Sequence, residues 1–330
     1  MRRTISIQPE TFPLSTPFRI SRGTKTAAEV VTVRIEQDGV AGRGECVPYP
    51  RYGETVDSTI AAISAVRDAL ESGVGRDELL RLMPAGAARN AVDCALWDLE
   101  ARLAGSDVAT MIGLKQPIGP IATAMTVGLD TPDRMRVAAA ALADVPVIKV
   151  KVDRTDPAAQ LRAVRDTAPL PRLIVDPNES WTIDEVSSLQ QLLIELRVDL
   201  LEQPLPAADD TALAGFVSAI PIAADESVHE ASNLAALPDG YAVVNIKLDK
   251  AGGLTAALDL AKEARRRGLG VMTGCMICSS LSIAPALMVV VNSIFADLDG
   301  PLWLANDREG GVECVGGMLS APRRGFWGDR

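Results

Sequence analysis

Eight short apolar runs recur along the last two thirds of the sequence, and this repeat restricts the fold more than any other feature. The runs are residues 121–127, 147–152, 173–176, 200–203, 221–225, 243–248, 269–274 and 293–299. Five successive runs carry a charged residue at or beside their end, at intervals of 25, 26, 23 and 22 residues: Lys151, Asp176, Glu202, Asp225 and Lys247. Parallel strands need crossovers of about a dozen residues or more, and these intervals supply them. The repeat therefore predicts an α/β fold, a modified (β/α)8 (TIM-like) barrel.

The first third of the chain has a different pattern, which indicates an α+β capping domain. Residues 29–36 alternate apolar and polar side chains, Asp38-Gly39 is a hairpin turn signal, and residues 40–46 form the returning strand. In residues 87–104 apolar side chains recur at steps of three and four, as on the buried face of a helix. The predicted division is a capping domain of residues 1–115, joined by the C-terminal segment 306–330, and a barrel of residues 116–305.

Composition limits the partners and the location. The formal net charge of −10 argues against nucleic acid as a partner, because nucleic-acid-binding domains present basic surface. The apolar run 283–291 is short and contains Pro285, and the start of the chain turns polar by Gln8. We therefore expect neither a membrane partner nor a signal peptide. A cytoplasmic protein with a small-molecule partner follows, and the sequence leaves open whether it forms a homo-oligomer.

Cysteine and histidine offer little chemistry. Cys275 and Cys278 form one CxxC without a second pair, which is more typical of packing residues in a reducing compartment than of a zinc site. His229 is the only histidine, so neither a histidine-rich metal site nor a Ser-His-Asp triad is supported. Catalysis is expected to rest on lysines, carboxylates or cysteines.

The charged residues at the strand ends are the candidate site, since barrel active sites lie at the C-terminal ends of the strands. Charges are costly to bury unless they are paired or bind a metal. Separate ion pairs at the rim would explain any single residue, but not a series on successive strands. Asp176, Glu202 and Asp225 come from three neighbouring strands, so their carboxylates can converge. An all-oxygen ligand set favours Mg²⁺, and one Mg²⁺ per active site is predicted.

The lysines indicate the type of reaction. Lys149 and Lys151 are two residues apart on one strand and point the same way, and Lys247 lies on the strand opposite in a ring of eight. A substrate carboxylate on the metal would hold its α-carbon between Lys151 and Lys247. Desolvation beside other cations is expected to lower a lysine pKa toward neutrality, so that it can act as a base. Two bases on opposite faces can invert a stereocentre through an enediolate.

Further polar residues are candidates for holding the rest of the substrate. Asp297 and Asp299 lie on the eighth strand, across the ring from Glu202, and could receive an ammonium group. A structural role for one of the two is the alternative. Asn178 shares a face with Asp176, and either orients it, contacts substrate, or is simply a satisfied polar side chain.

The motifs at these positions resemble a known family. IKVKVD, IVDPNESW, LLEQPLP, ADES, NIKLDKAGGLT, GCMICSS and DLDGP are similar to motifs of the muconate-lactonizing-enzyme subgroup of the enolase superfamily. Within it, the likeness is greatest to the L-Ala-D/L-Glu epimerases linked to murein peptide recycling. The likeness covers nearly the whole chain, including PYPRYGE and PAGAARNAVDCALWDLEARLAG in the first domain.

The resemblance implies a role for each residue. The implied Mg²⁺ ligands are Asp176, Glu202 and Asp225; the implied bases are Lys151 and Lys247; Lys149 would help at the substrate carboxylate, and Asp297 and Asp299 would hold the ammonium group. Two capping loops, around residues 21–26 and 48–54, are expected over the barrel mouth. Arg22 or Lys25 would meet the Glu side chain, although relatives that prefer Glu usually carry arginine where this chain has Lys25, and lysine lacks bidentate geometry. Thr126, in the first run, is also assigned to the substrate-binding residues.

The expected function is that of a Mg²⁺-dependent dipeptide epimerase, an isomerase that inverts the second residue of L-Ala-D/L-Glu. The alternatives within the superfamily are N-acylamino-acid racemase, o-succinylbenzoate synthase and cycloisomerase, whose substrates have no free ammonium for Asp297 and Asp299. Acid-sugar dehydratases usually need a histidine base, and a metal-dependent hydrolase would be expected to use histidine ligands. A non-catalytic ligand-binding barrel is the alternative from another class.

Overall fold

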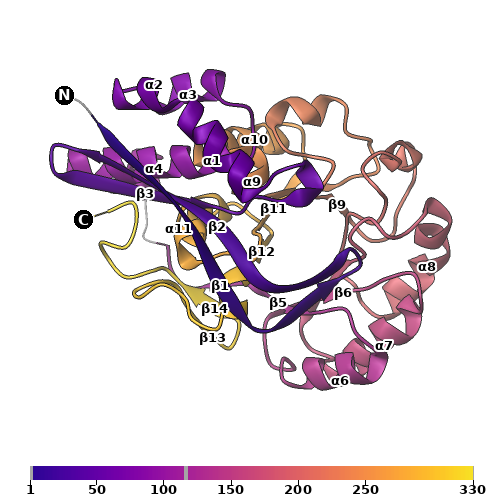
Figure 1. The fold of residues 1–330 in the computed structure, drawn as a ribbon. Coiled ribbons are helices and arrows are strands. Elements are labelled where there is room, and N and C mark those ends of the chain that lie inside the picture. The colour runs from indigo at the N-terminus through magenta and orange to yellow at the C-terminus, as the bar shows by residue number, and fades with distance from the viewer. Residues whose placement is uncertain (1–2, 115–117, 330) are drawn as a thin grey trace.

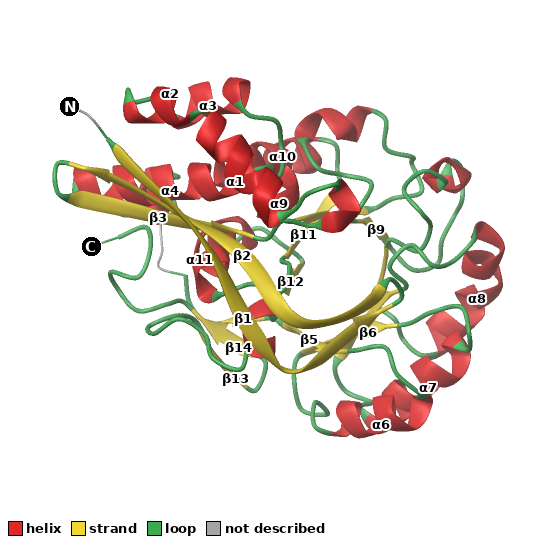
Figure 2. Ribbon diagram, in the orientation of Figure 1, coloured by secondary structure: helices red, strands yellow, loops and turns green. Residues whose placement is uncertain are grey.

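The computed structural model describes residues 3–114 and 118–329, and it consists of a barrel and an N-terminal sheet with helices (Figures 1 and 2). The boundary predicted between residues 115 and 116 lies outside the described residues. Among the helices described, none combines the length and the apolarity that crossing a bilayer requires.

Eight parallel strands form the barrel, and they pair in chain order. They are β5 (Ala124–Val127), β6 (Val147–Lys151), β7 (Arg172–Asp176), β8 (Leu200–Glu202), β9 (Ile222–Ala224), β10 (Val243–Ile246), β11 (Gly270–Gly274) and β12 (Phe295–Asp297). A parallel bridge between Thr123 and Ala296 closes the ring. The predicted barrel is confirmed, except that the first run is split, because β4 (Ile121–Ala122) pairs with a C-terminal strand instead.

The crossovers between these strands are not all α-helical. The α-helices are α6 (Pro132–Ala140), α7 (Pro157–Thr167), α8 (Ile183–Glu195), α9 (Leu248–Ala251), α10 (Leu254–Arg266) and α11 (Ser280–Val290). Only the short 3-10 helices η2 (Asp210–Leu213) and η3 (Ala231–Ala235) precede β9 and β10, and η4 (Gly300–Trp303) follows β12. Local sequence determines where α8 begins: the Thr182 and Glu185 side chains each accept a hydrogen bond from the other residue's backbone N–H.

The N-terminal domain packs helices on a three-stranded antiparallel sheet. Its elements are β1 (Thr4–Ile20), β2 (Gly23–Gln37), β3 (Val40–Cys46), η1 (Pro50–Tyr52), α1 (Val56–Ala65), α2 (Arg67–Glu71), α3 (Arg76–Leu82), α4 (Ala87–Ala104) and α5 (Val108–Met111). The predicted turn and helix are confirmed: Asp38 and Gly39 both have positive φ, 55° and 77°. Helix α4 lies so close to β3 that a side chain at Gly44 would collide with the Ala91 carbonyl. Figure 1 shows the long β1–β2 hairpin crossing over the barrel.

The C-terminal segment contacts both parts of the molecule. Strands β13 (Glu313–Val315) and β14 (Met318–Ser320) form a small sheet with β4. Arg308 forms ion pairs with Glu10 and Glu45 of the N-terminal domain. The assignment of residues 306–330 to the capping domain stays a prediction.

An apolar layer fills one level of the barrel interior. Each of the eight strands contributes one buried side chain: Ala124, Val147, Ile174, Leu200, Ala223, Val243, Met272 and Phe295. Such layers of inward side chains make the barrel a packed core with no open channel. The polar residues of the candidate site stand above this layer.

Candidate active site

The polar residues lie two and four positions beyond the apolar layer, toward the C-terminal ends of the strands. Since side chains alternate along a strand, a step of two keeps the same inward direction. The first step gives Thr126, Lys149, Asp176, Glu202, Asp225, Asn245, Gly274 and Asp297, and the second includes Lys151, Asn178, Lys247 and Asp299. All the predicted barrel residues of the site therefore belong to two successive rings.

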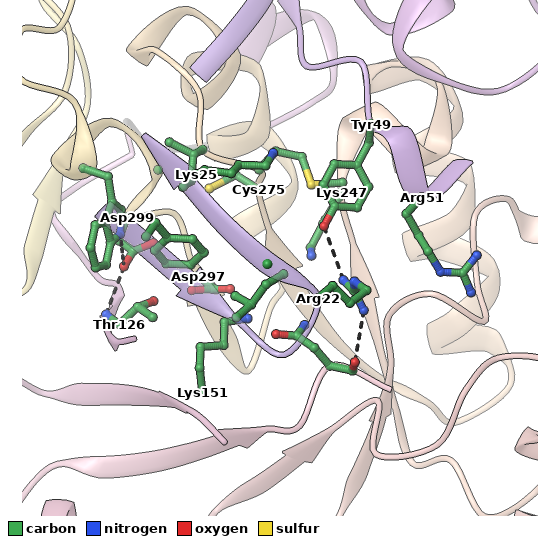
Figure 3. Close-up of a pocket in the computed structure, with 18 of the residues that line it drawn as sticks. Arg22, Lys25, Tyr49, Arg51, Thr126, Lys151, Lys247, Cys275, Asp297 and Asp299 are labelled. Atoms are coloured by element: carbon green, nitrogen blue, oxygen red, sulfur yellow. Dashed lines mark hydrogen bonds between the residues drawn. The ribbon is translucent and has the colours of Figure 1, made fainter. Parts of the chain in front are cut away.

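A pocket of about 450 Å³ lies between these rings and the capping domain. Its barrel wall includes Lys149, Lys151, Lys247, Asp297 and Asp299, and its capping wall comes from the hairpin and from η1. Figure 3 shows Lys151 and Lys247 entering the pocket from different sides. The pocket is thus bounded on one side by the lysines and aspartates predicted from sequence.

The three predicted metal ligands are fully buried and paired with lysines. Lys149 Nζ lies 3.1 Å from Asp176 Oδ2 and 2.7 Å from Glu202 Oε2. Lys151 Nζ lies 2.5 Å from Asp176 Oδ2, and Lys247 Nζ lies 2.6 Å from Asp225 Oδ2. The structure therefore brings together all five residues that the sequence placed on successive strand ends.

These carboxylates suit a hard divalent cation. Glu202 Oε2 and Asp225 Oδ1 are buried oxygens that accept no hydrogen bond within the described part of the chain, although each lies 2.7 Å from a lysine ammonium. Desolvation raises the pKa of Glu202 to about 7, and the charges of Asp176 and Asp225 add to this effect. Among residues 3–114 and 118–329, no group of three such ligands already encloses a metal position. The three carboxylates nevertheless fit Mg²⁺, because they repel one another and offer only oxygen ligands, two of which accept no hydrogen bond in the described part of the chain.

The predicted fall in lysine pKa is wrong for Lys247. Burial lowers its pKa, but the combined attraction of Asp225, whose oxygen is 2.6 Å away, and of Glu202 and Glu226 leaves the pKa well above the ordinary value. The prediction considered neighbouring cations, whereas the nearest charge is a carboxylate.

Asp297 and Asp299 have different surroundings. Asp297 Oδ2 lies 2.8 Å from Lys149 Nζ, while Asp297 Oδ1 is buried without a hydrogen-bond partner among the described residues. Asp299 Oδ2 accepts hydrogen bonds from the Thr126 backbone N–H (3.0 Å) and Trp303 Nε1 (3.2 Å) (Figure 3). Burial and the charge of Asp297 raise the pKa of Asp299 to about 6. Both carboxyl groups line the pocket and can receive a cation.

Arg22 and Lys25 line the pocket in unlike ways. The Arg22 guanidinium is paired with Glu226 (2.8 Å) and Glu179 (3.1 Å). Lys25 forms no ion pair within the described residues, and its Nζ lies 4.8 Å from the ring centroid of Tyr49. Burial lowers the pKa of Lys25. Lys25 is therefore the better placed of the two to meet an acidic substrate side chain.

Sequence reasoning missed three residues that support the carboxylates. Asn245 Nδ2 donates to Glu202 Oε1 (2.9 Å), and Gln203 Oε1 accepts from the Asp225 backbone N–H (2.8 Å). Lys250 is fully buried, with its Nζ 2.7 Å from Asp225 Oδ1. Asn245 could have been found by the two-residue step from Val243, but Lys250 follows the strand on α9 and no periodicity points to it. Asn178, by contrast, was predicted, and it donates through its backbone N–H to Asp176 Oδ1 (2.8 Å).

Comparisons with known families agree with this geometry. Residues 2–113 match the N-terminal domain model of mandelate racemase / muconate lactonizing enzyme, and residues 133–325 match the enolase C-terminal domain-like model. The chain is 50% identical to an L-Ala-D/L-Glu epimerase of Escherichia coli K12, over 96% of this chain and 99% of the relative. It is 40% identical to an N-acetyl-D-glutamate racemase of Pseudoalteromonas, over 91% of this chain and 95% of the relative.

Solved structures are similar over nearly the whole length. An enolase family member from Agrobacterium tumefaciens, with bound sodium and L-Ala-L-Glu, has a TM-score of 0.96 and 47% identity, covering 99% of this chain and all of that one. A dipeptide epimerase from Methylococcus capsulatus, complexed with Mg and L-Arg-D-Lys, has a TM-score of 0.89 and 33% identity, covering 98% of both chains.

Proposed function

The chain belongs to the mandelate racemase / muconate lactonizing enzyme family of the enolase superfamily and is an isomerase, and from this premise we propose that it epimerises the second residue of L-Ala-D/L-Glu. The observation that carries the proposal is the arrangement of charges around one pocket. Two lysines enter it from opposite strands, carboxylates for a metal lie beneath them, and an aspartate pair stands across from those carboxylates.

Asp176, Glu202 and Asp225 would hold one Mg²⁺, the ion present in the Methylococcus capsulatus structure. When bound, Mg²⁺ supplies positive charge that stabilises the substrate carboxylate as the α-proton leaves, and it offsets the carboxylate charges that raise the lysine pKa. Asn178, Asn245, Gln203 and Lys250 keep the three carboxylates in place through the contacts described above.

Lys151 and Lys247 perform the proton transfers. Because β6 and β10 are four strands apart in a ring of eight, each ammonium can reach only one face of the α-carbon. One lysine in its neutral form removes the proton, and the other, protonated, delivers one to the opposite face. Lys149, at the centre, contributes a fixed positive charge beside the substrate carboxylate.

The ends of the dipeptide are recognised by charge. Asp297 and Asp299 accept hydrogen bonds from the N-terminal ammonium, and Lys25 pairs with the Glu side chain. Such charge-assisted contacts in a closed pocket determine which substrates bind. A free N-terminus and an acidic second residue are therefore the expected requirements, and a cytoplasmic role in recycling murein peptides is consistent with them.

The test is incubation with L-Ala-L-Glu and Mg²⁺ in D₂O, followed by NMR of the α-proton and chiral analysis of the product. We expect deuterium at the second residue and formation of L-Ala-D-Glu. Absence of both with the Mg²⁺-loaded enzyme would refute the proposal.

N-acylglutamate racemisation is a second candidate, because the Pseudoalteromonas relative, an N-acetyl-D-glutamate racemase, is 40% identical. It would use the same lysines but leave Asp297 and Asp299 without an ammonium partner. Comparison of kcat/KM for L-Ala-L-Glu and for N-acetyl-L-glutamate separates the two. A preference for the acetylated substrate would favour the racemase.

A further inference from the structure

A buried glutamate outside the catalytic rings joins both capping loops to the barrel. Glu179 lies in the loop after β7, three residues beyond Asp176, and its side chain is 7% exposed. Arg51, in η1, donates to it twice, from Nε to Oε2 (2.9 Å) and from NH2 to Oε1 (2.8 Å). Arg22, at the tip of the β1–β2 hairpin, donates from NH1 to Oε2 (3.1 Å). We propose that Glu179 is a positioning residue that fastens both capping loops over the pocket.

The loop that carries Glu179 is held firmly to the barrel. The Ala207 backbone N–H donates to Glu179 Oε1 (2.9 Å), and the Glu179 backbone N–H donates to the Gln203 carbonyl (2.9 Å). Asn178 and Glu179 both have positive φ, 47° and 65°, which is unfavourable for residues other than glycine. These contacts maintain a backbone conformation that directs the carboxylate toward the two loops.

The capping loops contact this carboxylate through Arg22 and Arg51, which themselves line the pocket beside other lining side chains of the same loops. Lys25 is three residues from Arg22, and Tyr49 and Tyr52 lie next to η1 residue Arg51; all line the pocket. Arg22 NH2 also lies 3.3 Å from Tyr49 Oη, which links one loop to the other (Figure 3). Holding the two arginines therefore places Lys25 and both tyrosines above the barrel.

Loosening this contact should weaken substrate binding more than the chemical step, since Glu179 does not line the pocket and touches none of the lysines in the described structure. The loss of hydrogen bonds between charged groups corresponds to about a tenfold change in the loop equilibrium. We expect KM for L-Ala-L-Glu to rise about tenfold, while kcat stays within about twofold. This kinetic part rests on the proposed function.

Limited trypsin digestion tests the contact without any substrate. Glu179→Gln keeps the shape and removes the charge, and Arg51→Gln removes the partner, whose side chain lines the pocket and is 39% exposed. Glu263→Gln is the matched control, because Glu263 also binds two arginines, Arg266 and Arg267, but on the outer face of α10. We expect cleavage after Lys25 to be about tenfold faster in both loop variants and unchanged in the control.

Cleavage after Lys25 in the double variant Glu179→Gln/Arg51→Gln should be no faster than in Glu179→Gln alone, because the ion pair with Arg51 is already absent. If Glu179→Gln does not fold, the rate of cleavage after Lys25 in Arg51→Gln tests the proposal. Wild-type cleavage after Lys25 and wild-type KM in the folded variants would overturn the proposal. If the wild type does not turn over the dipeptide, the proposed function fails, while the digestion still tests the contact.

Discussion

Replacing Lys25 with glutamine should remove the proposed preference for an acidic second residue. Lys25 is the pocket cation that forms no ion pair among the described residues, whereas Arg22 is paired with Glu226 and Glu179. The charge of Lys25 is partly removed from water by burial, which lowers its pKa. An incoming carboxylate would restore the lost solvation, so the contact should favour binding.

The size of the effect follows from this environment. A hydrogen bond to a charged group contributes about 1.5–3 kcal/mol, which is about 10- to 150-fold in kcat/KM at about 1.4 kcal/mol per factor of ten. The assay compares kcat/KM for L-Ala-L-Glu and L-Ala-L-Gln in the wild type and in Lys25→Gln. In Lys25→Gln, the ratio of kcat/KM for L-Ala-L-Glu to kcat/KM for L-Ala-L-Gln should fall by this factor, chiefly because kcat/KM for L-Ala-L-Glu decreases.

Lys262→Gln provides the control, since Lys262 is an exposed lysine on α10. It should leave both substrates unaffected. An unchanged Glu/Gln ratio in Lys25→Gln would show that another group meets the side chain, and the assignment of Lys25 would be wrong.

Three further predictions concern the metal, the aspartate pair and stability. Exhaustive chelation should abolish turnover, and Glu202→Gln should weaken Mg²⁺ binding in calorimetry at least tenfold, as expected for loss of one charged ligand; full activity after chelation would refute the metal site. Because the pKa of Asp299 is raised to about 6, the protonated fraction grows below that pH, and kcat/KM for the dipeptide should fall there more steeply in the wild type than in Asp299→Asn. Gly44→Ala should lower the free energy of unfolding in urea by about 3 kcal/mol or more, since the added methyl collides with the Ala91 carbonyl; a smaller loss would mean that α4 can move.

The barrel and its polar rings could be predicted because they depend on counting along strands. Once the eight runs are placed, a step of two residues leads from Val147 to Lys149, and the same step leads from Leu200 to Glu202. The helix at residues 87–104 was equally accessible, since its apolar spacing covers the whole element.

Contacts between distant parts of the chain could not be predicted in this way. The pairing of Arg22 with Glu179 joins residues that are 157 positions apart, and no local pattern indicates it. The 3-10 crossovers before β9 and β10 were also missed, because an interval of suitable length does not specify the kind of helix. The high pKa of Lys247 depends on the distance to Asp225, which only coordinates provide.

The two-base mechanism is tested most directly by α-proton exchange in D₂O with Lys151→Ala and Lys247→Ala. Each variant should lose epimerisation, and each should still exchange the α-proton of one diastereomer of Ala-Glu, the two variants acting on opposite ones. Exchange restricted in this complementary way is the predicted result. Normal epimerisation by either variant, or exchange of the same diastereomer by both, would contradict the assignment of one lysine to each face.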